Sequence, residues 1–333
     1  MPNPVASDVH VSVPLTNISI AYMQAATGFV ADRVFPNIPV SKQANRYTRY
    51  DRSDFWRNQF QKRAPSTESA GGGWKIDNTA NYFADVWALH KDIDDDTRAN
   101  QDEQIDMDRD ATIWLTQQAL ISREVTWAAN NFTTGIWGTD ITGAASAPSA
   151  SQVLQWNDAA SDPIVDITKK SDVVHLASGI RPNKLVLGRQ VWSVLKDHSD
   201  TLDRVKYTGG NNTPAIVTRQ AFASMCELDS IEVMDGIQVT SPENPSYETS
   251  MTTAWIAGKN ALLVYANPTP SLLTPSGGYT FSWTGRVAAS QQGTRISRLR
   301  IDQIKSDRVE GEMAYDQKVI AKDCGLFFGS VIA

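Results

Sequence analysis

The most regular hydrophobic pattern in the chain runs from Asp102 to Asn131. Apolar residues recur there every three or four positions, as on one face of an α-helix. Acidic residues gather at the start of this segment, where the helix dipole favours negative charge. The pattern predicts a helix roughly 45 Å long, which would suit a spine. One apolar stripe contains Met107, Ala111, Trp114, Ile121, Val125, Ala128 and Phe132, and a second contains Ile113, Leu120 and Trp127.

The first ninety residues lack the pattern of a compact domain. Pro36 and Pro39 exclude a regular helix or a central strand around them. Residues 46–63 mix aromatic and basic side chains, whereas Trp74–Ile76 and Tyr82–His90 alternate as strands do. The pattern predicts an arm followed by a projecting two-stranded loop. Such segments have too little core of their own, so they must pack on something else.

The second half begins after Ala144–Ser151, a low-complexity segment that predicts a loop and an internal boundary. Helical and strand patterns then alternate, as in an α/β lobe, until Pro268 and Pro270. The remainder favours β structure and ends in the apolar run 326–332. Helices are predicted over 164–178, 190–198 and 219–226, strands over 184–188, 230–234, 254–257 and 261–265, and β-rich segments over 279–283, 296–304 and 318–321.

The charge changes sign between the predicted loop and the predicted helix. The loop is basic, whereas acidic residues far outnumber basic ones between Asp92 and Asp110. Two surfaces of opposite charge on adjacent copies would attract each other and favour assembly in one defined register. The alternative interpretation is two solvated surfaces of opposite sign. The predicted contact residues between subunits are Arg46, Arg49, Arg52, Trp56, Arg57, Lys62 and Arg63 in the loop, and Asp94, Asp95, Asp96, Asp102 and Asp106 in the acidic segment.

Composition excludes several classes of protein. The net charge of −6 gives no sign of a generally basic nucleic-acid binder. Cys226 and Cys324 are too few for a disulfide framework, and we expect them to be buried in a reducing cytoplasm. No apolar run is long enough to span a bilayer, and the first residues lack the regions of a signal peptide. The sequence therefore predicts synthesis and folding in the cytoplasm.

The acidic cluster Asp92–Asp96 is the most enzyme-like feature. Dense carboxylates can hold Mg²⁺ or Ca²⁺, but the spacing of a calcium loop, with its central Gly and terminal Glu, is missing. The four histidines are scattered, and no Gly-x-Ser-x-Gly elbow is present. Gly71–Gly73 lacks the following Lys-Ser/Thr of a phosphate loop. These patterns predict no catalytic, metal-binding or cofactor-binding residues, and hence a protein that is not an enzyme.

The order of these segments resembles that of the major capsid proteins of tailed phages, which share the Hong Kong 97-type fold. Three stretches are similar to that family as well. Ser178–Gly188 with the following Val191–His198 resembles a part of its apical (A) domain, and Trp255–Tyr265 resembles the strands that close this domain. Tyr315–Cys324 is similar to the last strands of its peripheral (P) domain. The resemblance covers nearly the whole chain, through order and pattern rather than one diagnostic motif.

The resemblance implies an α+β fold and a division into five segments. It also implies a loop that lies across the next subunit and a shell of hexamers and pentamers around double-stranded DNA. Because the arm-like segment starts almost at Met1, we expect a separate scaffolding protein rather than a fused one. The segments are an N-terminal arm (1–40), an extended loop (41–90), a P domain with the spine helix (91–150), an A domain (151–270) and a return to the P domain (271–333).

The expected partners are further copies of the chain, the scaffolding protein and a portal, with a decoration protein and non-specific contact with packaged DNA as further possibilities. The expected location is the virion, after assembly in the host cytoplasm, with no membrane contact. Two alternatives remain open: the shell protein of an encapsulin-like nanocompartment, and a metal-dependent hydrolase that uses Asp92–Asp96.

Overall fold

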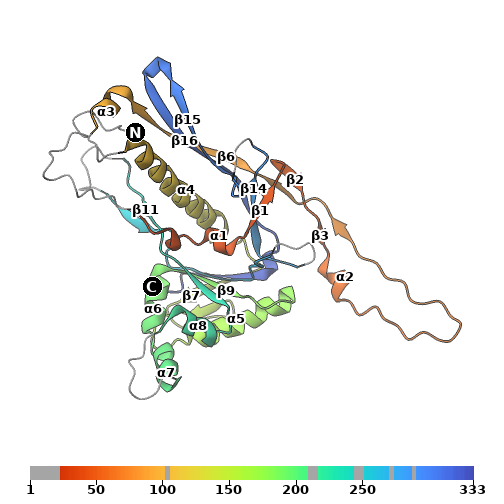
Figure 1. Ribbon diagram of the computed structural model, residues 1–333. Coiled ribbons are helices and arrows are strands. Elements are labelled where there is room, and N and C mark those ends of the chain that lie inside the picture. Colours follow the sequence, from red (N-terminus) through yellow and green to blue (C-terminus); the bar gives the residue numbers. More distant parts are fainter. Residues whose placement is uncertain (1–22, 102–105, 209–216, 244–250, 270–273, 287–289) are drawn as a thin grey trace.

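The computed structural model describes residues 23–101, 106–208, 217–243, 251–269, 274–286 and 290–333, and its architecture is the α+β one that the sequence predicts. Two sheets dominate (Figure 1), one built largely of long strands beside a long helix, the other of short strands among helices. No helix of the described part is long and apolar enough to cross a membrane.

The first sheet has five strands and carries the long helix α4. Strand β16 (Ser306–Val319) lies at its centre and pairs antiparallel with its neighbours β6, β14 and β15. The edge strand β1 pairs parallel with β14. The other strands are β1 (Asn37–Val40), β6 (Asp85–Asp94), β14 (Gly278–Trp283) and β15 (Thr294–Ile301).

Helix α4 (Met107–Asn131) is the predicted spine. Its first residues follow Asp106, whose carboxylate accepts hydrogen bonds from the amides of Asp108 and Arg109 at 3.2 and 3.1 Å. Residues 102–105, where the pattern placed the start of the helix, lie outside the described residues. The 25 residues span roughly 37 Å.

The apolar face of α4 packs on the first sheet, but the predicted second stripe is partly wrong. Met107, Ala111 and Leu115 are buried against β6 and β16. Trp127 is fully buried, whereas Ile113 of the same predicted stripe is 43% exposed. Ile113 lies roughly 200° around the helix from Leu115, so it points away from the sheet.

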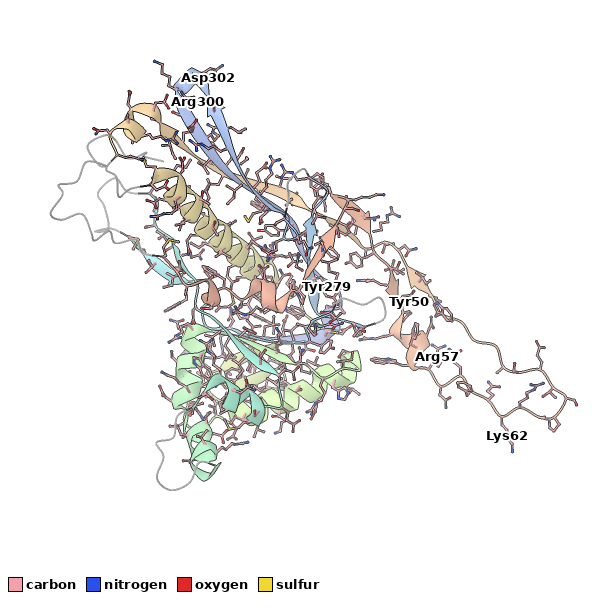
Figure 2. The ribbon with its side chains drawn as sticks, in the orientation of Figure 1. Tyr50, Arg57, Lys62, Tyr279, Arg300 and Asp302 are labelled. Carbon is pink, nitrogen blue, oxygen red and sulfur yellow. The ribbon has the colours of Figure 1, made fainter. Side chains whose placement is uncertain are left out.

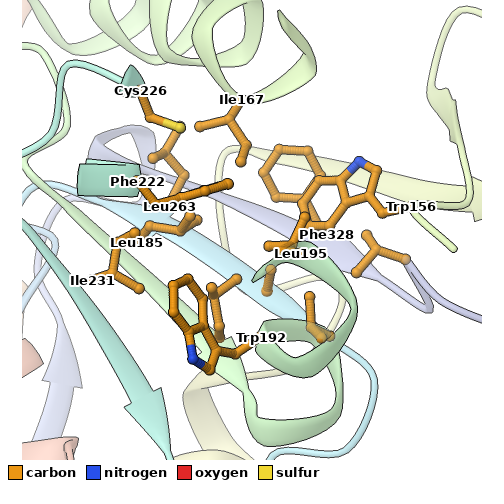
Figure 3. Close-up of a cluster of buried hydrophobic side chains, with 14 of the residues drawn as sticks. Trp156, Ile167, Leu185, Trp192, Leu195, Phe222, Cys226, Ile231, Leu263 and Phe328 are labelled. Carbon is orange, nitrogen blue, oxygen red and sulfur yellow. The ribbon is translucent and has the colours of Figure 1, made fainter. Parts of the chain in front are cut away.

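The second sheet has six short strands in the order β10-β9-β13-β17-β7-β8. Its apolar cluster lies under helices of the same lobe (Figure 3) and includes Trp156, Leu185, Leu195, Phe222 and Phe328. The strands are β7 (Thr139–Ala144), β8 (Gln152–Leu154), β9 (Lys184–Gly188), β10 (Ser230–Met234), β13 (Ala261–Val264) and β17 (Gly325–Gly329). The helices are α5 (Pro163–Ser178), α6 (Arg189–Asp197), α7 (Ser199–Thr208) and α8 (Arg219–Met225).

Two placements in this sheet are not evident from the sequence. The apolar tail forms β17, which lies between β13 and β7 and pairs with both. The low-complexity segment 145–151 connects β7 and β8, which are adjacent parallel strands of the same sheet. The chain therefore closes the α/β lobe with its last described strand.

A short N-terminal segment joins the two sheets. Helix α1 (Ala31–Val34) and its neighbours contribute Val30, Val34 and Phe35 to a cluster that contains Trp127 from α4 and Phe327 from β17. Phe35 contacts the ring of Trp127 edge to face, with the centroids 5.6 Å apart. This part of the predicted arm is thus buried within its own chain.

Small ribbons and single turns complete the fold. Helix α2 (Arg52–Trp56) interrupts the loop that the pattern predicted to be extended, and it begins after Asp51, whose carboxylate accepts a hydrogen bond from the amide of Ser53. The remaining elements are β2 (Ala44–Arg46), β3 (Arg49–Tyr50), β4 (Ile76–Asp77), β5 (Asn81–Phe83), α3 (Asp95–Ala99), β11 (Ile237–Val239) and β12 (Thr253–Trp255), with 3₁₀ turns at Ala26–Gly28, Asp302–Ile304 and Lys322–Cys324.

Candidate functional site

The segment between β1 and β6 forms a loop that projects far from both sheets (Figure 2). Its base is fixed by the ladders β2–β5 and β3–β4 and by stacked rings. Tyr82 and Tyr47 both stack on Phe281 of β14, with ring centroids 4.6 and 5.9 Å apart. The base is therefore part of the first sheet's core, whereas residues 57–75 continue beyond it.

The outer part of the loop exposes large apolar side chains. Phe60 is 98% exposed and Trp74 is 65% exposed. Phe55 and Trp56, on α2, are each exposed by more than half. Exposure of so many aromatic rings on one slender projection is unusual for a protein that remains a monomer, because contiguous exposed apolar surface usually marks an interaction site.

The seven loop residues predicted to contact another subunit fall into two groups. Arg49 lies 3.6 Å from Asp77 on the paired strand, Arg52 lies 2.8 Å from Asp323, and Arg63 donates to the carbonyl of Thr67. Trp56 lies against Gly179 of its own chain. The side chains of Arg46, Arg57 and Lys62 make no ion pair with any residue that the structure describes, and Lys62 lies near the far end of the loop (Figure 2).

The acidic residues at the start of the spine have partners in their own chain. The carboxylate of Asp94 accepts a hydrogen bond from the amide of Thr97 at 3.4 Å and caps α3, as Asp106 caps α4. Asp95 pairs with both terminal nitrogens of Arg300, at 2.5 and 2.6 Å. Asp96 is exposed, and Asp102 lies outside the described residues.

Arginines of β15 and β16, which lie outside the predicted basic loop, supply partners for Asp92 and Asp95. Arg308 holds Asp92 through two hydrogen bonds of 2.7 and 2.8 Å. Asp307 accepts hydrogen bonds from Arg98 and Arg298, and these donors lower the pKa of Asp307 well below its ordinary value. The signal in the sequence was the run of arginines at 295, 298, 300 and 308 in a segment with strand alternation.

These ion pairs bear on the hydrolase hypothesis. Asp92 and Asp95 each have both carboxylate oxygens bound by a guanidinium, which lowers their pKa values through hydrogen bonds to the charged form. Among the described residues, no group of three or more His, Cys, Asp or Glu side chains is arranged to hold a metal ion. The geometry of Asp92 and Asp95 fits ion pairing at a sheet edge.

Ser161 and His198 form the other arrangement that resembles a catalytic pair. The His198 Nε2 lies 3.2 Å from both the Ser161 hydroxyl and the Asp158 carbonyl, and its Nδ1 accepts a hydrogen bond from the Asp200 amide. An Nδ1 that accepts must be unprotonated, so Nε2 carries the proton and cannot act as a base toward Ser161. Both side chains are buried, and the pair satisfies polar groups within the lobe.

A buried carboxylate on the spine was also missed. Glu124 accepts hydrogen bonds from the amides of Val30, at 2.9 and 3.1 Å, and of Ala31, at 2.8 Å. Burial raises the pKa of Glu124 to about 7, although these two amides oppose the shift. The neighbouring Arg123 pairs with Asp32 at 2.6 Å. Two adjacent residues of α4 thus hold the N-terminal end of α1.

Two curated relatives match the chain over most of its length. The major capsid protein of Pseudomonas phage JBD67 is 28% identical over 330 residues, which cover 96% of each chain. The major capsid protein of Burkholderia phage BcepMu is 24% identical over 301 residues, which cover 88% of this chain and 89% of the relative. No family model matches the chain.

Solved structures share the architecture. A phage-related protein of Bordetella bronchiseptica RB50 has a TM-score of 0.66 at 18% identity and covers 93% of this chain and 94% of its own. The capsid protein of cyanophage P-SCSP1u has a TM-score of 0.62 at 12% identity, and the match covers 98% of this chain and 95% of the cyanophage protein. The SrpI encapsulin of Synechococcus elongatus PCC 7942 is less similar, with a TM-score of 0.52 at 10% identity. The match covers 96% of this chain and 95% of the encapsulin. The chain is a homologue of phage major capsid proteins and has the Hong Kong 97-type capsid fold.

Proposed function

We propose that this subunit assembles with itself, as hexamers and pentamers, into the icosahedral shell that encloses the double-stranded DNA of a tailed phage. The observation that carries the proposal is the projecting loop (Figure 2), whose outer part has exposed aromatic rings and basic groups that form no ion pair with the described residues. Burial of that surface under a second copy would stabilise the contact by roughly 25 cal/mol for each Å² of apolar area that is removed from water. Many such interfaces, closed by symmetry, make a stable shell.

Charge gives a second reason for contact between copies. Lys62 near the end of the loop and Arg300 near the tip of the β15–β16 hairpin lie at opposite extremes of the subunit (Figure 2). The loop therefore cannot reach the acidic segment beside that hairpin within one chain. We propose that the loop of one subunit docks near the acidic segment of another. Exposed Asp96 would contribute directly, and the helix-capping Asp94 and Asp106 and the paired Asp95 would act through their combined field.

The five-segment division is part of the same proposal. The first sheet and α4 would form the P domain, and the lobe around the six-stranded sheet would form the A domain at the centre of each capsomer. Residues 41–90 would be the loop that crosses to a neighbour. The β17 tail pairs within the six-stranded sheet, so we assign the end of the return segment to the A domain.

We infer that the subunit acts structurally and not as an enzyme, that it is built into the virion after assembly in the host cytoplasm, and that a scaffolding protein and a portal take part. A decoration protein on the outside, and non-specific contact of the inner wall with DNA, would complete the particle. The capsid proteins among the relatives support the coarse statement of self-association.

Electron microscopy of the purified chain, alone and after co-expression with candidate scaffolding proteins, tests the proposal. We expect uniform hollow shells or rings of capsomers. A monodisperse monomer under all salt and scaffold conditions would reject it.

A charge-reversal variant tests the docking of the loop. Arg46, Arg57 and Lys62 have no ion pair within the described part of their own chain, so their replacement by Glu should leave the subunit folded but reduce shell yield. The matched control replaces Lys169 and Lys170 of α5 by Glu, and we expect it to assemble normally. Equal shell yields for the two variants would contradict the electrostatic part of the proposal.

The similarity to an encapsulin supports a second candidate, a nanocompartment shell with a protein cargo. The contents of particles formed in the natural host separate the two functions. Packaged double-stranded DNA supports the phage shell, and a co-purifying enzyme without DNA supports the nanocompartment.

A further inference from the structure

The base of the projecting loop is held against the α/β lobe of its own subunit. Helix α2 of the loop lies beside the C-terminal end of α5 (Figure 1). The Arg52 Nη1 donates to the carbonyl of Ala177 in the last turn of α5 and lies 2.8 Å from the carboxylate of Asp323. One guanidinium therefore connects the loop to two elements of the lobe.

The end of α5 is suited to receive a cation. The last carbonyls of a helix have no partner within it, and the helix dipole places partial negative charge there. Gly179 ends the helix in the left-handed conformation (φ +78°), and its amide donates to the carbonyl of His175 at 2.8 Å. The carbonyl of Ala177 is thereby left for Arg52, and Asp323 adds a full negative charge beside it.

Trp56 makes the second contact of α2 with the lobe. Its Cζ2 lies 2.7 Å from the position that a Cβ on residue 179 would occupy, so a side chain there would force the ring out of its present position. The Arg52 guanidinium lies 5.8 Å from the centroid of the same ring, within the range of a cation–π interaction. Arg52 and Trp56 thus contact the end of α5 together.

Both sides of the loop contact α2 or continue from it. Asp54 on α2 accepts a hydrogen bond from the amide of Lys75 on the returning side, at 2.9 Å, and Phe55 lies beside Trp74 with centroids 6.3 Å apart. A constraint on α2 therefore orients the whole projection beyond residue 57.

We propose that Arg52, Trp56 and Gly179 form a latch within the subunit, which fixes the direction in which residues 57–75 leave it. In this role Arg52 is a positioning residue of its own chain and not a contact to a neighbour. The benefit for assembly rests on the proposed shell function: a loop that already points outward loses less conformational freedom when it docks. The latch itself does not depend on that function.

The latch is tested on the orientation of the loop in the unassembled, full-length subunit. Spin labels are attached to cysteines that replace Lys62 in the loop and Lys169 on α5. Cys226 and Cys324 are buried and do not compete for the label. Pulsed electron resonance then gives the distribution of distances between the labels, and we expect one narrow distribution for the parent.

Two pairs of variants separate the latch from general damage. Gly179→Ala and Gly135→Ala place a side chain at similar left-handed angles (φ +78° and +85°), but only the first pushes against Trp56, since nothing lies within 4 Å of the new methyl at 135. Arg52→Ala removes the latch cation, and Arg57→Ala removes a neighbouring arginine that makes no ion pair with the described residues. We expect broad distributions for Gly179→Ala and Arg52→Ala and the parental distribution for Gly135→Ala and Arg57→Ala.

Unchanged, narrow distributions in both latch variants would overturn the proposal, as would equal broadening in Gly179→Ala and Gly135→Ala. Shell formation is recorded separately by electron microscopy of the unlabelled chains. A parent that forms no shells, with loop orientation still lost in the latch variants, would reject the shell function and leave the latch standing.

Discussion

The carboxylate of Glu124 accepts a hydrogen bond from the backbone amide of Ala31, 2.8 Å away, and so joins the spine helix to the first turn of α1. The bond forms where α1 meets α4, in a cluster of aromatic side chains that also reaches the second sheet. Asp32, Arg33 and Arg123 are the charged groups around it. Protonation of Glu124 therefore changes the hydrogen bonding between α1 and α4, at the place where the two halves of the fold meet.

The first prediction concerns the pH dependence of stability. Because the pKa of Glu124 is raised from 4.5 to about 7 in the folded chain, the folded state holds a proton that the unfolded state has lost in that window. The free energy of unfolding should then fall as the pH rises from 4.5 to 7. Denaturant titrations across this range should show a weaker fall in Glu124→Gln. Asp110→Asn, at an exposed position of the same helix, is the control and should keep the parental slope.

The second prediction concerns the ion pairs at the β15–β16 hairpin. Hydrogen bonds from Arg298 and Arg98 hold the pKa of Asp307 below its ordinary value of 3.8. Its contribution to stability is therefore present above that value and is lost as acid protonates it. Asp307→Asn should lower the Tm at pH 7 and make little difference at very low pH.

Asp302→Asn is the matched control for Asp307→Asn. Asp302 lies at the tip of the same hairpin and is almost fully exposed, and its carboxylate forms an ion pair with Arg300, at 3.4 Å. Asp302→Asn should leave the Tm unchanged at both pH values. An equal effect of the two variants at pH 7 would contradict the assigned role of Asp307.

The third prediction concerns close packing at Gly325. A Cβ there would lie 2.1 Å from Cε3 of Trp137, which is itself buried. Gly325→Ala should therefore destabilise the chain by about 1–3 kcal/mol or prevent folding. Gly73→Ala is the control, because nothing lies within 4 Å of its new methyl, and thermal unfolding should show the difference.

The fourth prediction concerns the core of the α/β lobe. Leu185 on β9 is fully buried among the residues drawn in Figure 3. Leu185→Ala should cost about 2–5 kcal/mol, the sum of lost apolar transfer and the cavity left behind. Leu176→Ala removes the same atoms from a side chain that is 85% exposed, so it should change stability by less than about 0.5 kcal/mol. Equilibrium denaturation of the two variants gives the comparison.

Local patterns in the sequence were sufficient for helices α4, α5, α6 and α8 and for most strands, whereas helices α1, α2, α3 and α7 were not predicted. The strand Ser230–Met234 has the predicted limits, and α5 and β9 differ from prediction by at most one residue. These segments combine regular periodicity with clear breaks, such as Gly179 after α5, so the information lies within a few residues.

The pairing of distant residues could not be derived in this way. Arg300 and Asp95 are 205 positions apart, and nothing in either neighbourhood specifies the other. The sequence pattern therefore suggested a free docking surface, although three of its five named residues, Asp94, Asp95 and Asp106, cap helices or pair with arginine in the same chain. Helix α2 was missed because it is a single turn with no buried residue, fixed by Asp51 and by the contacts of Arg52.

The central position of β17 sets an order of events during synthesis. The strand pairs with β13 and β7 on its two sides, and Phe327 and Phe328 fill clusters on the two faces of that sheet. Until β17 has been synthesised and has left the ribosome, the lobe has a gap where the strand belongs and its hydrophobic clusters are incomplete. The α/β lobe can therefore be completed only after β17 has been translated.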